Sequence, residues 1–129
     1  MILGGLFKAK ANTTKTGNDA ERAAEDYLRA RGLEVVARNY RCRFGEIDLI
    51  MQERDTLVFV EVRLRRSSKG IDFGGAAASI TGRKQARIIS AAQHYLAGMK
   101  QLPPCRFDAI LMVSADEAGI EWMRGAFEA

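Results

Sequence analysis

Four charged side chains on two neighbouring segments carry the most informative chemistry in this sequence. Glu46 and Asp48 are two residues apart in one alternating segment, and Glu61 and Arg63 are two residues apart in the next. Side chains at that spacing point to the same face of a β-strand. Converging carboxylates are the ligands that a hard divalent cation such as Mg²⁺ prefers. The pattern predicts a site for Mg²⁺ or Mn²⁺ on Asp48 and Glu61.

The register of the two segments follows from the turn between them. Residues 44–51 and 57–64 have the alternation of two paired strands. A two-residue turn at Arg54-Asp55 closes the hairpin and places Asp48 opposite Glu61, with Cβ atoms ~5 Å apart. Like charges at that distance repel each other, so strands usually avoid the arrangement. We therefore interpret the pair as a functional feature.

The same register assigns the apolar residues to faces. Ile47, Leu49 and Met51 are expected to point together to one face of the hairpin. Ile50 is expected on the other face, beside the charged residues and opposite Phe59.

A structural alternative uses the same charges. Glu46 can pair with Arg63, and Asp48 with Arg65, on a solvated face that binds nothing. The alternation does not decide between this ion-pair network and a metal site.

A resemblance to a known family covers nearly the whole chain, from about Thr16 to Phe127. The matching stretches are Thr16-Gly17 with Glu21, residues 45–51, residues 58–63, residues 74–79, residues 105–108, and Glu121-Trp122 with Ala126-Phe127. In these stretches the sequence resembles the YraN-type family of small endonuclease-like proteins. That family is a branch of the restriction-endonuclease-like superfamily, which includes archaeal Holliday-junction resolvases.

The resemblance implies a role for each matching position. Asp48 is similar to the metal-binding aspartate, and Glu61 to the acidic residue of the Glu-x-Lys element. Glu21 resembles the helix glutamate that completes the acidic cluster of junction resolvases. Arg63 stands where the superfamily usually has lysine. Arginine stays protonated and cannot act as a general base, but it can orient a phosphate and neutralise developing charge.

Two assignments near the site are left open by the sequence: the role of Glu21, and which residue reaches the site from the second helix. Glu21 follows Asn18 by three residues, which is close to a capping box, and this role is compatible with a place in the acidic cluster. Lys84 or Gln85 can reach the site from the start of the second helix, and the sequence does not rank one above the other.

Basic residues form a rim around the acidic segments, with Tyr40 and Phe44 interleaved in its first part. The rim consists of Arg38, Arg41, Arg43, Arg65, Arg66 and Lys69 beside the strands and of Arg83, Lys84 and Arg87 at the start of the second helix. Such a rim is typical of phosphate contacts that position a nucleic-acid strand. The alternative is a scatter of solvated charges. The residues predicted to bind nucleic acid are Arg41, Arg43, Arg65, Arg66, Arg83 and Lys84.

The composition restricts the class of protein. The net charge of +4 and pI near 9.3 permit a polyanionic partner without requiring one. Cys42 and Cys105 are in no metal-ligand spacing and are expected to be reduced thiols. His94 is the only histidine, so neither histidine catalysis nor a zinc site can be built. No segment approaches the ~20 apolar residues of a membrane span, and we expect a cytoplasmic protein with no membrane partner.

The elements that must position these residues form an α/β fold in the order α-β-β-β-α-β-β. We expect a restriction-endonuclease-like central mixed β-sheet flanked by helices, in a single domain over residues 18–129 that follows a mobile N-terminal arm over residues 1–17. Besides the hairpin, the expected elements are helices over 19–31 and 81–97 and strands over 33–37, 106–113 and 119–123.

These observations favour a metal-dependent nuclease that hydrolyses phosphodiesters, with catalytic residues Glu21, Asp48, Glu61 and Arg63. DNA is the favoured partner over RNA, branched or flapped structures are candidate substrates, and a homodimer is left open. The alternative is a non-catalytic nucleic-acid-binding or protein-docking module that retains the nuclease fold. Arg63 favours the alternative, whereas Glu21, Asp48 and Glu61 favour the enzyme.

Overall fold

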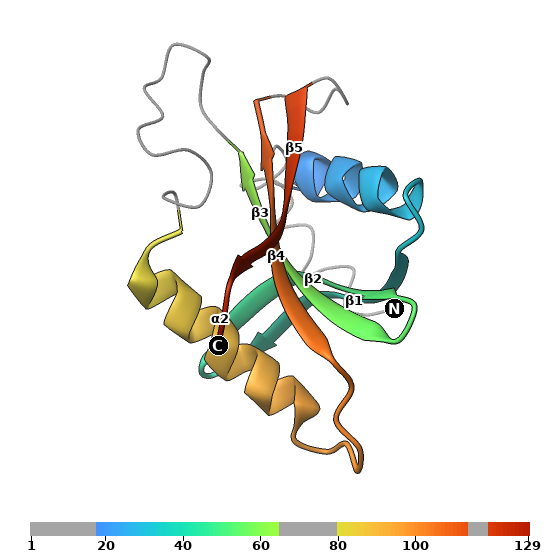
Figure 1. Ribbon diagram of the computed structural model, residues 1–129. Coiled ribbons are helices and arrows are strands. Elements are labelled where there is room, and N and C mark those ends of the chain that lie inside the picture. The colour runs from blue at the N-terminus through green and yellow to red at the C-terminus, as the bar shows by residue number, and fades with distance from the viewer. Residues whose placement is uncertain (1–17, 65–79, 114–118) are drawn as a thin grey trace, which may run out of the picture.

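The computed structural model describes residues 18–64, 80–113 and 119–129 (Figure 1). The predicted N-terminal arm, residues 1–17, lies outside the described residues, as do Arg65 and Arg66.

A five-stranded mixed sheet forms the centre of the fold, with the strands in the order β1-β2-β3-β4-β5. Neighbouring strands are antiparallel except for β3 and β4, which are parallel. The predicted α/β class and the order α-β-β-β-α-β-β are confirmed. The strands are β1 Glu34–Cys42, β2 Gly45–Glu53, β3 Thr56–Leu64, β4 Cys105–Met112 and β5 Ile120–Phe127; the helices are residues 18–29 and α2 Gly82–Leu96.

One helix covers each face of the sheet and creates a hydrophobic core there (Figure 1). The first helix buries Ala20, Ala24 and Leu28 against one face. The predicted stripe of α2 lies against the other face, where Ile88, Ala91 and Ala92 are buried and Tyr95 and Leu96 are partly buried. The sheet is therefore the middle layer of three.

The ends of both helices follow local sequence signals. Thr81 is the N-cap of α2, and its hydroxyl accepts a hydrogen bond from the Lys84 N–H at 3.1 Å, as its position predicts. The first helix gives way to a turn that ends at Gly32, which has φ +101°. Glycine adopts this left-handed backbone without the steric cost of a Cβ atom.

The two edge strands are longer than the sequence predicted. The expected strand over 33–37 extends to Cys42, and the expected strand over 119–123 extends to Phe127. The added segments are rich in polar or small residues and lie on the outer strands, where much of the chain stays exposed. Edge strands tolerate such residues, so the hydrophobic pattern ends before the strand does.

The hairpin register is confirmed at its closed end. Glu53 pairs with Thr56 across the two-residue turn, and Ile50 pairs with Phe59. Arg54 has φ +58°, an uncommon conformation for a non-glycine residue, and the Gln52 amide supports it by donating to the Arg54 carbonyl at 2.9 Å. The alternation of the flanking strands thus overrides the weak turn propensity of Arg-Asp.

The prediction for Ile47 is wrong, because strand β2 changes faces at Asp48. Ile47 packs in the core beneath α2, whereas Leu49 packs beneath the first helix. Strand β1 changes faces at the same level, between Arg38, which pairs with Leu49, and Tyr40, which pairs with Ile47. The residue between them, Asn39, has φ +50°. This left-handed residue interrupts the regular alternation of side chains.

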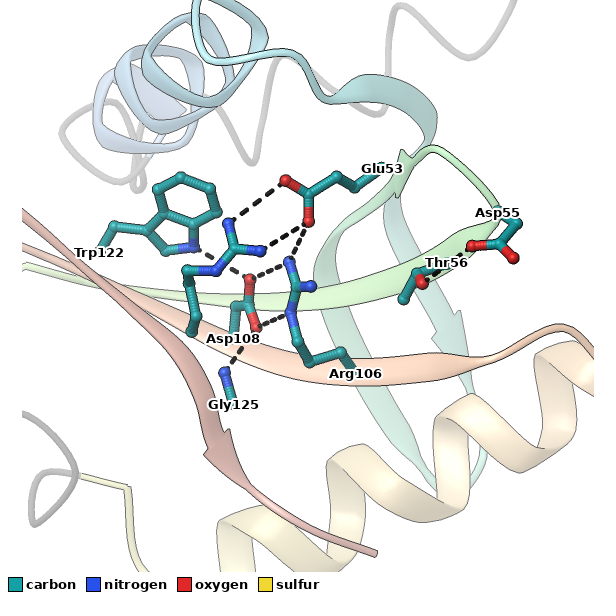
Figure 2. Close-up of polar contacts among 8 residues, drawn as sticks. Glu53, Asp55, Thr56, Arg106, Asp108, Trp122 and Gly125 are labelled. Carbon is teal, nitrogen blue, oxygen red and sulfur yellow. Dashed lines mark hydrogen bonds and ion pairs between the residues drawn. The ribbon is translucent and has the colours of Figure 1, made fainter.

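A network of polar contacts around the buried carboxylate of Asp108 joins strands β4, β5 and β2 (Figure 2). Asp108 has 0% exposure and accepts from the Arg106 guanidinium at 2.8 and 3.1 Å and from the Trp122 indole at 2.9 Å. The Gly125 N–H donates to the same carboxylate at 2.9 Å. Arg106 also forms an ion pair with Glu53 at 2.9 Å. Because every partner is supplied from within the fold, this network stabilises the sheet.

Two smaller features concern the cysteines and the lengths of the helices. Cys42 and Cys105 are both free thiols. Neither helix in the described residues is long and apolar enough to cross a membrane.

Candidate metal centre

Asp48 lies where the ladder between β2 and β3 ends. The last backbone pair of this ladder is Leu49 with Val60. One residue further, the Asp48 carboxylate accepts a hydrogen bond from the Val62 N–H at 2.8 Å. The side chain thus takes the place of a strand carbonyl. Its carboxyl group also hydrogen-bonds to that of Glu61, so the two residues face each other as the register predicted.

Glu61 is 5% exposed and lies on the face of β3 that α2 covers. Its Oε2 lies 3.5 Å from Lys84 Nζ and 3.6 Å from Arg63 Nη1. Burial and the neighbouring Asp48 carboxylate raise the pKa of Glu61 from 4.5 to about 7, although Lys84 and Arg63 oppose the increase. Two cations therefore do not offset the cost of this buried carboxylate.

Glu21 reaches Asp48 from the opposite face of the sheet. Its carboxyl group hydrogen-bonds to Asp48 and to the Asn39 side chain. Burial and the Asp48 charge raise the pKa of Glu21 to about 7, while the bond to Asn39 lowers it. Residue 18 already belongs to the helix, so Asn18 is not the residue that caps it. Glu21 is brought to the site, as the resemblance implied.

The change of face at Asp48 is what allows residues from both sides of the sheet to meet. Asp48 hydrogen-bonds to Glu21 from one side, to Glu61 from the other and to the Val62 N–H along the strand. Burial raises the pKa of Asp48, and the Val62 N–H and the charge of Lys84 oppose this increase. The pKa is therefore raised at all three carboxyl groups that meet here, Glu21, Asp48 and Glu61.

The donor set fits Mg²⁺ or Mn²⁺. Asp48 and Glu61 are oxygen donors whose mutual repulsion a divalent cation relieves. Among residues 18–64, 80–113 and 119–129, no three His, Cys, Asp or Glu side chains are placed to hold one ion together. Among these residues, Asp48 and Glu61 are therefore the carboxylates that would hold a cation, which would depend on other oxygen atoms, such as those of water, for its remaining positions.

The structure ranks the two candidates from the start of α2. Lys84 extends to Glu61, whereas the Gln85 amide donates to the Ile80 carbonyl at 2.9 Å. A primary amine thus lies beside Glu61 although Arg63 stands at the position where the resemblance implied a lysine.

The arginines predicted to bind nucleic acid fall into three groups according to their surroundings in the structure. Arg41 forms an ion pair with Glu46 at 3.0 Å, and the Arg43 guanidinium lies over the Phe44 ring. Arg83 is exposed on the first turn of α2. Arg65 and Arg66 lie outside the described residues, so the alternative pairing of Asp48 with Arg65 is not tested.

A hollow of about 390 Å³ lies next to the carboxylates, between the β1–β2 turn and α2. Its charged lining consists of Arg41, Glu46, Lys84 and Arg87. Arg87 belongs to the basic rim that the sequence indicated at the start of the second helix. Its spacing of three residues from Lys84 places both on one side of the helix, and this was the signal available in the sequence.

Two further residues at the site were not predicted. Asn39 hydrogen-bonds to Glu21, and the signal for it is that asparagine adopts left-handed φ values more readily than other non-glycine residues. The buried Glu25 carboxylate binds Arg38 on β1, and nothing in the sequence pattern connects these two residues.

Comparison with known proteins places the chain in a family. The model of the Uncharacterised protein family UPF0102 matches residues 20–112. A UPF0102 protein of Nitrosomonas europaea is 57% identical over 112 residues, which cover 87% of this chain and 92% of the relative. A UPF0102 protein of Methylobacillus flagellatus is 55% identical over 113 residues, which cover 88% of this chain and 96% of the relative. The chain belongs to the UPF0102 family, which is the YraN-type family that its motifs indicated.

Proposed function

We propose that this protein is a Mg²⁺- or Mn²⁺-dependent nuclease that hydrolyses phosphodiester bonds in DNA, with branched or flapped structures as its substrates. One observation carries the proposal: the buried carboxyl group of Glu61 faces the partly buried one of Asp48, with Lys84 and Arg63 beside Glu61. Burial and the neighbouring Asp48 raise the pKa of Glu61, and a divalent cation bound between the two carboxylates would relieve the cost of placing them together.

Asp48 and Glu61 would hold the cation, which on binding supplies Lewis acidity toward a phosphate and lowers the pKa of water. The Val62 N–H orients Asp48, and Glu21 limits the position of Asp48 from the other side. Arg63 donates to a phosphate oxygen and neutralises charge that develops on the phosphorus substituents. Lys84 Nζ lies close enough to Glu61 to orient the attacking nucleophile.

A non-catalytic nucleic-acid-binding module is the second candidate, and the arginine at position 63 favours it. The two candidates differ in what Arg63→Lys does. In an adapted site the variant loses activity, because bidentate phosphate contacts are lost although the charge is kept. In a decayed site the variant gains activity well above the parent.

The deciding experiment incubates the full chain with end-labelled single-stranded, duplex, flapped and four-way branched DNA, each with Mn²⁺ and with chelator. We expect cleavage of at least one structure only with Mn²⁺, and none by Asp48→Asn. Binding without cleavage of any DNA in this panel would leave the non-catalytic module as the function.

A further inference from the structure

The tip of the β1–β2 hairpin presents an aromatic side chain to solvent. Cys42 pairs with Gly45, so Arg43 and Phe44 form a two-residue turn. Phe44 is 43% exposed and belongs to neither hydrophobic core. A single exposed apolar side chain is ordinary on a protein surface, so what distinguishes Phe44 is the set of groups that surround its ring.

The Phe44 ring lies among planar polar groups. The Arg43 guanidinium carbon is 5.1 Å from the ring centroid, and the His94 ring of α2 is 5.8 Å away at a tilt of 57°. His94 Nδ1 is hydrogen-bonded to the Tyr40 hydroxyl, which fixes the imidazole. Tyr40 in turn lies edge-on against Tyr95 at 5.2 Å. The rings of Phe44 and His94 thus form an aromatic surface, beneath which lie the partly buried Tyr40 of β1 and Tyr95 of α2.

Gly45 holds this tip close to α2. A Cβ atom at position 45 would lie 2.9 Å from the Arg87 carbonyl oxygen, which is a steric clash. Only glycine permits this approach. Because the backbone of the tip packs directly on α2, the Phe44 ring keeps a fixed position relative to the helix.

Positive charge surrounds the same surface. The adjoining hollow has three cations, Arg41, Lys84 and Arg87, against the single carboxylate of Glu46. In the part of the chain that the structure describes, no carboxylate pairs with Arg43 or Arg87. Aromatic rings beside unpaired cations are the combination that binds the bases and phosphates of single-stranded nucleic acid.

The basic residues of α2 connect this surface to the metal centre. Three residues lie along one side of α2: Lys84, Arg87 and His94. Of these, Lys84 lies beside Glu61. The rise from Lys84 to His94 is about 15 Å at 1.5 Å per residue. That length corresponds to roughly four nucleotides of one strand at about 3.4 Å each.

We propose that Arg43, Phe44 and His94 form a stacking site for an unpaired nucleobase, on a single-stranded segment whose phosphates follow Arg87 and Lys84 to the metal centre. The inference rests on the proposed function and specifies its substrate: DNA with unpaired nucleotides beside the cleavage position. Intact duplex cannot offer a base face to Phe44 because its bases are stacked on each other. The charge of the surface favours this occupant over an apolar protein segment or a second copy of the chain.

The test measures binding of the full chain to fluorescently labelled single-stranded and duplex DNA of one sequence, in chelator, so that cleavage is not needed. We expect Phe44→Ala to weaken single-strand binding about tenfold and duplex binding less than about twofold. Phe44→Trp is expected to bind single strands at least as tightly as the parent. Val36→Ala is the matched control, since Val36 is an apolar residue of β1 with 41% exposure, and it should leave both affinities unchanged.

A second measurement locates the stacked base. A 2-aminopurine placed at successive positions of the strand should be quenched at one position by the parent and at none by Phe44→Ala. The stacking site is overturned if Phe44→Ala binds single strands as the parent does, or if the parent prefers duplex. It is also overturned if Phe44→Ala changes only the molecular mass in solution, which assigns the surface to a second copy. If Phe44→Ala still cleaves DNA in the presence of metal and binds it with unchanged affinity, the stacking site is rejected and the proposed nuclease function is kept. If the parent neither binds nor cleaves DNA, the stacking site and the nuclease function are both rejected.

Discussion

The guanidinium of Arg38 binds the buried carboxylate of Glu25 through two N–H donors, at 2.7 and 2.8 Å. Glu25 lies one helical turn after Glu21, and Arg38 directly precedes Asn39. The ion pair therefore fixes the helix and the strand whose side chains meet at Asp48. Neither residue contacts the candidate metal ligands through an observed bond, so we regard both as positioning residues.

Loss of the two-donor geometry should affect turnover more than metal binding. Arg38→Lys keeps the charge but not the paired donors, and we expect kcat to fall about tenfold while Mn²⁺ affinity changes less than about twofold. Arg29→Lys is the control, because Arg29 is exposed and lies 3.6 Å from the same carboxylate. Cleavage assays at saturating Mn²⁺, with melts to confirm folding, provide the measurement. Equal losses in the two variants would show that the Glu25–Arg38 pair has no special role.

The stability of the metal-free protein should depend on Glu61 and on pH. The pKa of Glu61 is raised to about 7 in the folded state, so its contribution to stability is fully present below the unfolded pKa near 4.5 and is lost as the pH rises through about 7. Glu61→Gln should therefore be more stable than the parent at about pH 8, by on the order of 2 kcal/mol, and similar to it at about pH 5.

Glu53 supplies the opposite control for this prediction. Its pKa is lowered by hydrogen bonds from Arg124 and Arg106, so its contribution is present above the unfolded pKa and is lost as the pH falls through the folded pKa. Glu53→Gln should destabilise the protein at about pH 8. Denaturant titrations in chelator at the two pH values measure both variants. If Glu61→Gln loses stability at high pH as Glu53→Gln does, Glu61 is part of a structural ion-pair network.

Cation binding should release protons. Near pH 6.5 Glu21 and Glu61 are largely protonated in the metal-free protein, and Glu61 must lose its proton to become a ligand. Calorimetric titration with Mn²⁺ in two buffers of different ionisation enthalpy should show roughly one proton released near pH 6.5 and almost none near pH 8.5. Asp48→Asn should show no binding heat. Metal binding without proton release at the lower pH would contradict the assignment of Glu61 as a ligand.

Substitutions of the neighbouring cations Lys84 and Arg83 on α2 should have different effects on DNA cleavage. Lys84→Gln removes the amine beside Glu61, and we expect activity to fall about a hundredfold or more. Arg83→Gln changes an exposed residue one position earlier, and it should reduce the salt dependence of DNA binding by about one counterion with little change in kcat. Rate measurements at saturating DNA and binding at several salt concentrations separate the two. Similar kinetics for both variants would place Lys84 among the general phosphate contacts.

The sequence predicted the elements of the fold and the hairpin register from Glu53–Thr56 to Ile50–Phe59, because hydrophobic alternation and a polar turn determine such a register. The side chains of Asp48 and Glu61, just beyond the last pair of the ladder, also meet as predicted. The sequence did not predict that β2 changes faces at Asp48. That change lies beside a left-handed residue of the neighbouring strand, Asn39, and the backbone conformation of one strand is not encoded by the hydrophobic pattern of another.

The contributions from α2 were only partly predictable. Periodicity located the buried side of the helix, including Ile88 and Ala92, since burial is averaged over many residues. Which polar residue reaches Glu61 depends on the rotation and docking of the helix, so Lys84 and Gln85 could be separated only by coordinates. The Arg43-Phe44 turn was missed because β1 continues through exposed polar residues that do not look like a strand.

The parallel pairing of β3 with β4 has a consequence for the order of folding. Strands β1, β2 and β3 are joined by two-residue turns and form contacts between near neighbours in the chain, whereas Leu57 must find Cys105 across the whole of α2. Such distant contacts carry the larger loop-closure cost and are expected to form late. Asp108→Asn, which weakens the β4–β5 side of the sheet, should therefore accelerate unfolding more than it slows refolding in a chevron analysis. Asp48 and Glu61 belong to the β2–β3 hairpin, which is expected to form early. Their carboxyl groups are therefore brought together before β4 and β5 add their stability. A cation present at that stage would assist folding.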